Sequence, residues 1–464
     1  IVYDVFSVGN FFNRTDSDSR YVNHNSNTAG TDNFIAGNNA GDAIASGGNY
    51  NTVVGNEAGT AITTGDNNTA VGFEALSTED ANSNNTAVGY RALKTLNAGS
   101  DAYNTAVGAD AGTSITTGLY NNIIGGLAGD AITTGDENIA IGVNALTAET
   151  AGNKSIAIGG GSLAAQNSTS DTDMNNVAIG YHAGLNVTTG IYNTIMGANT
   201  GDALTDADYN VAIGGNALST DTKGNKSTAL GYGALNAQNQ TSSTDTNNVA
   251  VGYTSGNHIT TGTSNTFVGF EAGNVYTTGY NNICIGKGAK GDANDRYLAY
   301  TIGVDCIAAG YDGITTIGTG SGSDRIYNTF KSNATWTRIS DERYKKDIQD
   351  NTDCGLAFIN DLKTRTFKWK AKSELTPDMP DYDAEKTTAD YPNKHYGLIA
   401  QEVKEALTNH NITDFGGHST VEADGKNIES IAQSMFVYPL IKAVQELSAK
   451  NDALEARIKK LEDG

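Results

Sequence analysis

Ser340 and Lys345 are the two residues whose types and spacing could support covalent chemistry in this chain. They lie in the segment TRISDERYKKDI (337–348), and Lys346 follows directly. A serine hydroxyl is a weak nucleophile until a neighbouring base removes its proton, and a lysine can be that base when burial favours its neutral amine. Taken alone, a serine five residues before a lysine is usually a solvated surface pair, so the rest of the chain must decide.

The pair lies where the composition of the 464-residue chain changes. Of the 55 glycines, 49 precede position 340, whereas all four prolines follow it. From Arg338 onward, 18 basic and 23 acidic residues give −5, which leaves −17 of the total −22 on the first 337 residues. Such an acidic surface repels nucleic acid and anionic membranes, and no apolar run reaches the roughly 20 residues that span a bilayer. We expect no nucleic-acid partner, no membrane insertion and at least two structural regions.

A repeated unit of about 17 residues fills the first two thirds of the chain. Its signature is an asparagine, a short apolar stretch and a glycine, as in NTAVG at 68–72 and NVAIG at 176–180. Sixteen closing glycines follow one another at intervals of 17 to 21 residues. Gly108, Gly180 and Gly252 occupy equivalent positions, so a four-unit block of 72 residues has been duplicated.

The unit predicts one coil of a parallel β-solenoid. Seventeen residues are too few for two packed helices, and an apolar pair before a glycine is typical of a short strand and a tight turn. We expect the second half of the unit, AITTG, to form another short strand, and Asn and Thr to bond between coils. The coils hold few large apolar residues, so we expect the Val/Ile pairs to be buried by several chains around an axis, as a trimer.

The NTAVG and NVAIG units resemble the NSVAIG-like head repeats of trimeric autotransporter adhesins (YadA-like proteins). This resemblance implies a trimeric parallel β-roll. It implies little about what such a structure binds.

The last segment, 431–464, carries residues at heptad spacing. Asn451 stands on this seam at an a position, where a polar residue commonly determines register and oligomeric state. We predict a trimeric coiled coil rather than a long surface helix of one domain. The seam consists of Leu440, Val444, Leu447, Asn451, Leu454, Ile458 and Leu461.

Residues 337–430 predict a small α/β or α+β domain, with helices in CGLAFINDLK and YGLIAQEVKEAL and a strand in TRTFKWKA. The segments SDERYKKDI, GLAFINDLKTRTFKWK and HYGLIAQEV, followed by a heptad helix, resemble the intramolecular chaperone of phage tail fibres and tailspikes, the S74 peptidase family. The resemblance implies that the domain trimerises, promotes folding of the fibre and then releases itself by cleaving the chain once.

Carried over to this sequence, the catalytic dyad of the S74 family would be Ser340 and Lys345. The bond that is cut would be Ile339–Ser340 or Ser340–Asp341. We expect a single-turnover serine endopeptidase, no other enzymatic activity, and no cofactor or metal. The six histidines are scattered, and the odd number of cysteines indicates free thiols: Cys284, Cys306 and Cys354.

The resulting prediction is a mainly β protein with five parts. An N-terminal lead-in (1–32) precedes a shaft of sixteen coils (33–318), and a linker follows (319–336). The S74-type chaperone and autoprotease domain (337–430) and the coiled-coil helix (431–464) complete the chain.

The first functional hypothesis is a phage tail fibre or spike, assembled in the host cytoplasm and carried on the virion. Its partners would be two further copies of itself, other virion tail proteins and a host-surface receptor, for which we expect a glycan. The repeat tyrosines could bind glycans but are expected to serve in packing: Tyr90, Tyr181, Tyr232 and Tyr253.

Two alternatives belong to other classes. A tailspike polysaccharide depolymerase needs two carboxylates about 5 to 9.5 Å apart, usually in a groove formed by long insertions. No interval between closing glycines exceeds 21 residues, and recurrent acids such as Glu57 and Asp110 are expected to be solvated. A bacterial trimeric surface adhesin should have a signal peptide and a membrane anchor, and we see neither pattern.

Overall fold

The computed structural model describes residues 30–464 except 311, 323, 330–336, 339, 380, 390–391 and 424–425. The chain divides into two units, Ile1–Asp341 and Glu342–Gly464. Residues 1–29 of the predicted lead-in and 330–336 of the predicted linker lie outside the described part.

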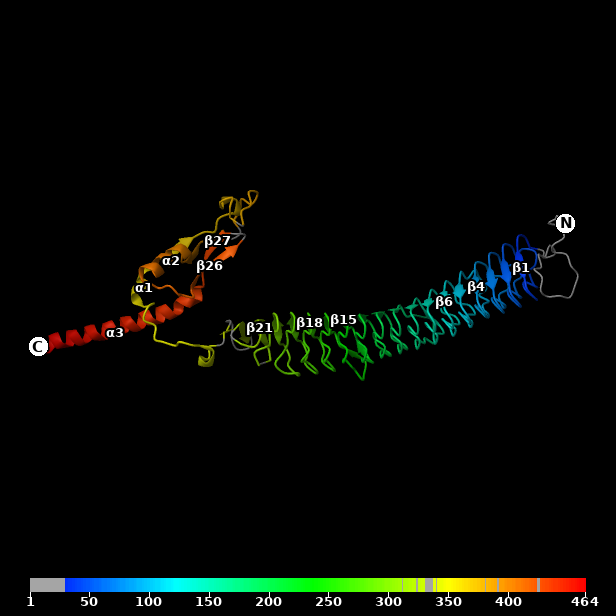
Figure 1. Cartoon of the computed structure of the whole chain (residues 1–464), viewed down its shortest axis with the longest axis horizontal. Helices are drawn as coiled ribbons and strands as arrows, with labels where there is room; N and C mark the ends of the chain where they lie inside the picture. Colours follow the sequence, from blue (N-terminus) through cyan, green and yellow to red (C-terminus); the bar gives the residue numbers. More distant parts are fainter. Residues whose placement is uncertain are drawn as a thin grey trace, which may run out of the picture. The chain divides into compact units, whose positions relative to one another are not determined.

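The first unit is a parallel β-solenoid in which each coil contributes one short strand to a continuous sheet (Figure 1). Seventeen of the strands described in this sheet run parallel, one more than the sixteen predicted coils. Strands β22 (Arg325–Thr329) and β23 (Thr337–Arg338) close the sheet in antiparallel register. The parallel strands are β1 (Phe34–Ala36), β2 (Thr52–Val54), β3 (Thr69–Val71), β4 (Thr86–Val88), β5 (Thr105–Val107), β6 (Asn122–Ile124), β7 (Ile139–Ile141), β9 (Ile156–Ile158), β11 (Val177–Ile179), β12 (Thr194–Met196), β13 (Val211–Ile213), β15 (Thr228–Leu230), β17 (Val249–Val251), β18 (Thr266–Val268), β19 (Ile283–Ile285), β20 (Tyr300–Ile302) and β21 (Ile314–Gly318).

The second half of the unit forms turns, so the prediction of a second strand in each coil is wrong. The N–H of Ile115 donates to the carbonyl of Gly112 in its own coil (3.1 Å), which closes a tight turn. The N–H of Thr116 then donates to Thr133 in the next coil (2.9 Å). Two-residue strands occur here in the 21-residue coils and their neighbours: β8 (Gly152–Asn153) pairs with β10 (Thr172–Asp173), and β14 (Gly224–Asn225) with β16 (Thr244–Asp245).

A single chain fills the core of the solenoid. The middle residue of each parallel strand of this sheet is buried, for example Ala70 or Ile123. The residue seven places after each of the first fourteen closing glycines is buried too, for example Ile132. Small alanines beside isoleucine or leucine side chains are enough to fill so narrow a coil. In the pairs Val53–Val54 and Ile123–Ile124 the first residue is buried by the single chain, against the expectation that several chains bury both. In strands such as Val177–Ile179 the buried residue is alanine, and the Val and Ile side chains stay half-buried.

Asparagines one coil apart form a hydrogen-bonded ladder along the core. The N–H of Asn138 donates to Oδ1 of Asn121 (2.9 Å), and Nδ2 of Asn138 donates to the carbonyl of Gly152 (2.8 Å). Each amide thus satisfies a backbone donor and a backbone acceptor that are buried at the corner of the coil. The predicted bonding of Asn between coils is confirmed, and this ladder explains why Asn precedes nearly every strand.

Removing one amide of this ladder should destabilise the solenoid. Asn193→Ala would leave the buried N–H of Asn210 and the carbonyl of Ala207 without their present partners (3.0 and 2.8 Å). We expect a loss of about 2 kcal/mol, because each unsatisfied buried group costs about 1–3 kcal/mol. Hydrogen exchange of the flanking coils measures it. Asn186→Ala changes an exposed amide of the same coil and is the control; equal exchange in both variants would contradict the ladder's role.

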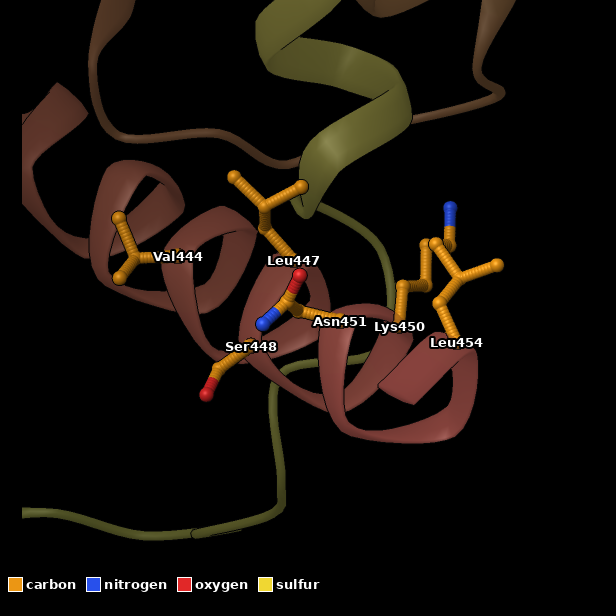
Figure 2. Close-up of a pocket in the computed structure, with 6 residues that line it drawn as sticks. All are labelled: Val444, Leu447, Ser448, Lys450, Asn451 and Leu454. Atoms are coloured by element: carbon orange, nitrogen blue, oxygen red, sulfur yellow. The ribbon is translucent and has the colours of Figure 1, made fainter. Parts of the chain in front are cut away.

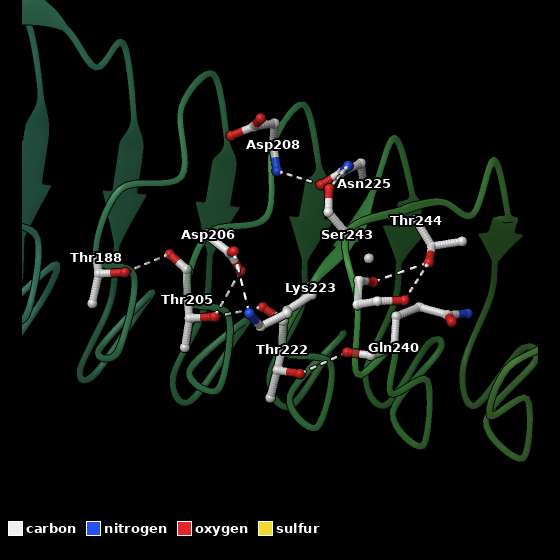
Figure 3. Close-up of polar contacts among 12 residues, drawn as sticks. Thr188, Thr205, Asp206, Asp208, Thr222, Lys223, Asn225, Gln240, Ser243 and Thr244 are labelled. Carbon is white, nitrogen blue, oxygen red and sulfur yellow. Dashed lines mark hydrogen bonds and ion pairs between the residues drawn. The ribbon is translucent and has the colours of Figure 1, made fainter.

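A second ladder of threonines runs along the turns (Figure 3). The hydroxyl of Thr188 donates to the carbonyl of Thr205 (3.1 Å), and the hydroxyl of Thr205 donates to the carbonyl of Thr222 (3.0 Å). An ion pair between Lys223 and Asp206 (3.4 Å) spans the same coils at the surface. Because exposed ion pairs contribute little, the backbone and amide ladders carry most of the polar stabilisation.

The second unit is a small α+β domain with a long C-terminal helix. Helix α1 (Leu356–Asp361) and helix α2 (Ala400–Asn409) pack around the buried side chains of Phe358 and Val403. Strands β24 (Arg365–Phe367) and β25 (His395–Gly397) pair, as do β26 (His418–Ala423) and β27 (Lys426–Ile431). Helix α3 (Val437–Glu462) ends the chain. The helices and the first strand agree with the sequence prediction, whereas the hairpin β26–β27 was not predicted.

Candidate functional site

The predicted dyad lies in the segment that joins the two units. Ser340 is exposed and belongs to the first unit, whereas Lys345 is exposed and belongs to the second. Between them is Asp341, followed by a single turn of 3-10 helix, η2 (Glu342–Tyr344). The N–H of Lys345 donates to the carbonyl of Glu342 (2.9 Å), which sets the direction of the chain after this turn. Ile339, on the other side of one candidate bond, lies outside the described residues.

Exposure of both side chains bears directly on their chemistry. A lysine serves as a general base when its neutral amine is favoured, and burial is the usual way to achieve this. In the single chain both Ser340 and Lys345 face solvent. The single chain therefore does not supply the burial that a Ser–Lys dyad at these positions would need.

The small domain anchors the long helix at its N-terminal end. Oε2 of Glu446 on α3 accepts the N–H of Leu356 at the start of α1 (2.8 Å). A Cβ added at Gly355 would lie 2.3 Å from the same carboxylate, so glycine permits this close approach. Arg365 binds Glu402 at the start of α2. Sequence analysis missed Glu446, because the heptad pattern assigns it no role on the seam.

The predicted heptad seam forms an uncovered apolar face on α3. Val444, Leu447, Asn451 and Leu454, together with Ser448 and Lys450, line a shallow depression along the helix (Figure 2). The six apolar seam residues are each at least 52% exposed, and Nδ2 of Asn451 donates to Glu455 in the same helix (2.8 Å). Six large apolar side chains in a row on one helix are typical of a surface that pairs with other helices.

A second apolar surface runs along the solenoid, and we call it the outer stripe. It consists of the third residue of each three-residue strand from β2 to β20, together with Ile317, the fourth residue of β21. These side chains face away from the core and are half-buried or exposed, reaching 41% at Ile285. Because the strands are stacked in register, these side chains lie one above another. The outer stripe comprises Val54, Val71, Val88, Val107, Ile124, Ile141, Ile158, Ile179, Met196, Ile213, Leu230, Val251, Val268, Ile285, Ile302 and Ile317.

The repeat tyrosines lie on the surface rather than in the core, and those with stacked neighbours pack on rings of adjacent coils. Their exposed fractions run from 45% for Tyr90 to 59% for Tyr181. The rings of Tyr232 and Tyr253 stack with centroids 5.4 Å apart, and Tyr253 stacks on Phe270 at 5.5 Å. At the position after the closing glycine, rings therefore stack from coil to coil in two short groups, Phe73 on Tyr90 and Tyr232 on Tyr253 on Phe270.

Other chemistry finds little support in the described residues. No group of three or more His, Cys, Asp or Glu side chains that could hold a metal ion occurs there. The three cysteines are free and buried, and burial raises the pKa of the Cys284 thiol to about 12, which disfavours its nucleophilic thiolate form. Within the same described part of the chain, no helix is both long and apolar enough to cross a membrane.

Comparison with known proteins finds one family. No curated protein and no solved structure matches the chain. The family model Peptidase_S74, described as chaperone of endosialidase, matches residues 340–412. The chain thus combines a parallel β-solenoid of about 17-residue coils with a C-terminal segment similar to the S74 chaperones of endosialidase.

Proposed function

We propose that this protein is part of a phage tail fibre or tailspike, a trimeric β-solenoid for host attachment whose C-terminal domain guides assembly and then cleaves the chain at Ser340. One observation carries the proposal. The family match begins at Ser340 itself, and the division between the two structural units falls between Asp341 and Glu342. A cut at either bond of Ser340 would release the chaperone from an intact solenoid.

Both uncovered apolar surfaces support a trimer as the working form. The seam of α3 would form the three-stranded coiled coil, and the outer stripe would supply apolar contacts between neighbouring solenoids. Parallel β-structures with nearly identical repeats fold slowly and can pair out of register. A coiled coil that holds three chains together at one end would select the correct register.

Cleavage would proceed by acyl transfer to the serine. For the Ile339–Ser340 bond, Oγ of Ser340 attacks the carbonyl carbon of Ile339. For the Ser340–Asp341 bond, the attacking hydroxyl is that of Ser340 in a neighbouring chain, because attack on its own carbonyl would close a strained four-membered ring. In both cases the amine of Lys345 takes the hydroxyl proton and passes it to the leaving amine. Water then hydrolyses the ester and restores the hydroxyl. Because both side chains face solvent in the single chain, assembly of the trimer would supply the burial that the lysine needs. Removal of the chaperone would leave the solenoid kinetically trapped.

Host attachment would use the solenoid surface or its end, with other virion tail proteins as further partners. The exposed, stacked aromatic rings and the polar turns are the surfaces that a host glycan could contact. The virion is the expected location of the mature protein.

Mass spectrometry of the freshly expressed full-length chain under denaturing conditions tests this function. We expect two fragments that meet at Ile339–Ser340 or Ser340–Asp341, and an intact chain in Ser340→Ala and in Lys345→Ala. Lys346→Ala is the matched control and should be cleaved like the wild type. A wild-type chain that trimerises but stays intact would overturn the dyad. Cleavage lost in Lys346→Ala and kept in Lys345→Ala would transfer the base to Lys346.

A further inference from the structure

One column of core side chains holds three carboxyl groups that no part of the proposed function uses. The column consists of the residue seven places after each of the first fourteen closing glycines. Three members of this column are acidic and fully buried: Glu79, Glu149 and Asp221. They recur at intervals of 70 and 72 residues, so they occupy equivalent coils of the duplicated block. The column reads Ile44, Ile62, Glu79, Leu96, Ile115, Ile132, Glu149, Gln166, Val187, Leu204, Asp221, Gln238, Ile259 and Tyr276.

Two of the three carboxylates have a glutamine in the next coil. Oε2 of Glu149 accepts Nε2 of Gln166 (2.8 Å), and its Oε1 accepts the N–H groups of Gly152 and Ser168 (2.7 and 3.0 Å). Gln166 also donates to the hydroxyl of Ser155 (2.9 Å), so it joins the carboxylate to the polar ladder.

Asp221 repeats this arrangement one block later. Its Oδ2 accepts Nε2 of Gln238, and its Oδ1 accepts the N–H groups of Gly224 and Gln240 (3.1 and 2.9 Å). Gln238 donates in turn to the hydroxyl of Ser227 (2.8 Å). Both of these buried carboxylates therefore have donors for both of their oxygens, which an ionised carboxylate requires in a protein interior.

Glu79 lacks the glutamine. Its neighbours in the column are Ile62 before it and Leu96 after it. Oε1 accepts the N–H of Asn82 (3.0 Å), but Oε2 is buried and has no hydrogen-bond partner. A buried oxygen without a donor disfavours the ionised form far more than the neutral acid.

We propose that the coil containing Glu79 is a pH-sensitive element of the solenoid, packed with this side chain as the neutral acid and loosened when the carboxylate ionises. In agreement with the geometry, burial raises the pKa of Glu79 from its ordinary 4.5 to about 7, against the smaller opposing effects of the backbone N–H groups of Asn82 and Asp80 and of the Asn82 side-chain amide. The negative charge of Asp80 adds to the increase.

The other charged and titratable groups of these coils do not compensate for the missing donor. Glu74 is bound to Arg91 and Lys94 in a cluster of its own (2.9 and 2.6 Å). Between residues 55 and 108, no charged or titratable side chain other than Glu79 is buried. The others are half-buried or exposed: Glu57, Asp66, Glu74, Asp80, Tyr90, Arg91, Lys94, Asp101 and Tyr103.

The sign of the effect follows from proton linkage. The pKa is higher in the packed coil than in the opened coil, so packing takes up a proton and the stability of the coil falls as pH rises from about 4.5 to about 7. Between these limits the opening equilibrium should rise roughly tenfold for each pH unit. The coils of Glu149 and Asp221, whose carboxylates are fully bonded, should not show this dependence.

Hydrogen exchange of the full-length chain across this pH range tests the proposal, after correction for the intrinsic exchange rate. Corrected exchange of peptides within 72–96 should increase as pH rises, because their coil opens more often, whereas exchange of peptides within 142–166 should not increase. Leu96→Gln supplies the missing donor and should flatten the profile at 72–96. Gln166→Leu is the reciprocal change and should create the same pH dependence at 142–166. Glu79→Gln, which cannot ionise, should abolish it at 72–96.

The proposal would be overturned if exchange in the wild type depended on pH in the same way at 72–96 and at 142–166. It would also be overturned if the pH dependence of exchange at 72–96 persisted in Glu79→Gln. If the variants fail to assemble, infrared spectroscopy of the wild type decides. A carboxylic-acid carbonyl band that disappears as pH rises through about 7 supports the proposal, and its absence at pH 6 refutes it.

Discussion

Gly125→Ala should disrupt the stacking of coils, whereas Gly126→Ala, one residue further on, should be nearly neutral. Gly125 closes its coil at φ +136°, and a Cβ placed there would lie 2.5 Å from the carbonyl oxygen of Gly142 in the next coil. Neither the backbone conformation nor the contact can be relieved without separating the two coils. Strain and clash together should cost roughly 3 kcal/mol or more.

The neighbouring glycine isolates the cause. A Cβ at Gly126 would have as its nearest contact the carbonyl oxygen of Ala109 at 4.0 Å, and its φ is not positive. Its substitution should change stability by about 0.5 kcal/mol or less. Hydrogen exchange and thermal unfolding of the full-length protein measure both variants, because opening of a repeat structure is local before it is global. If Gly125→Ala and Gly126→Ala had similar thermal unfolding midpoints and similar hydrogen-exchange rates, the stacking of coils would not depend on glycine at the closing position.

Leu454→Asp should abolish trimer formation by the full-length chain and, with it, correct assembly of the solenoid. Leu454 is 54% exposed on α3 and stands in the middle of the seam. Burying each large seam side chain contributes about 1.5–3 kcal/mol, so six of them are the main source of association energy in the coiled coil. A carboxylate from each of three chains at one seam layer would replace that gain by desolvation and repulsion.

Ala456→Asp is the matched control for the seam, because it adds the same charge two residues away at an f position of the heptad. Analytical ultracentrifugation should show a trimer for the wild type and for Ala456→Asp, and smaller or aggregated species for Leu454→Asp. A trimer that survives Leu454→Asp would show that another surface, such as the outer stripe, holds the chains together.

Much of the fold could be predicted because each coil repeats the same local rule. The NTAVG-type signature places an amide at a corner, a small or apolar residue in the core and a glycine at a closing turn, and sixteen copies make the period unmistakable. The seam of α3 was visible for the same reason. Both are patterns in which spacing alone determines which side chains share a face.

What the sequence did not reveal depends on contacts between different coils or elements. A turn replaces the second strand because the N–H of Ile115 bonds to a carbonyl of its own coil. The strand propensity of the residues does not show whether that N–H bonds within the coil or to the next one. Glu446 caps α1 across 90 residues of sequence. The exposure of Ser340 and Lys345 could not be read from their types. The pairing of Glu149 with Gln166 could have been found in the sequence, because an acidic residue and a glutamine recur with the same spacing one block later, as Asp221 and Gln238.

A stack in which coils bond only to their nearest neighbours has an adjustable length. Gly108 and Gly180 occupy equivalent positions, so loss of the block between them would join coils whose side chains already match. Each such event would shorten the solenoid by about 19 Å, four coils at about 4.8 Å each, and duplication would lengthen it by the same step. Recombination between such similar blocks can therefore change the reach of such a protein in discrete increments while each coil still stacks on a coil of the same type.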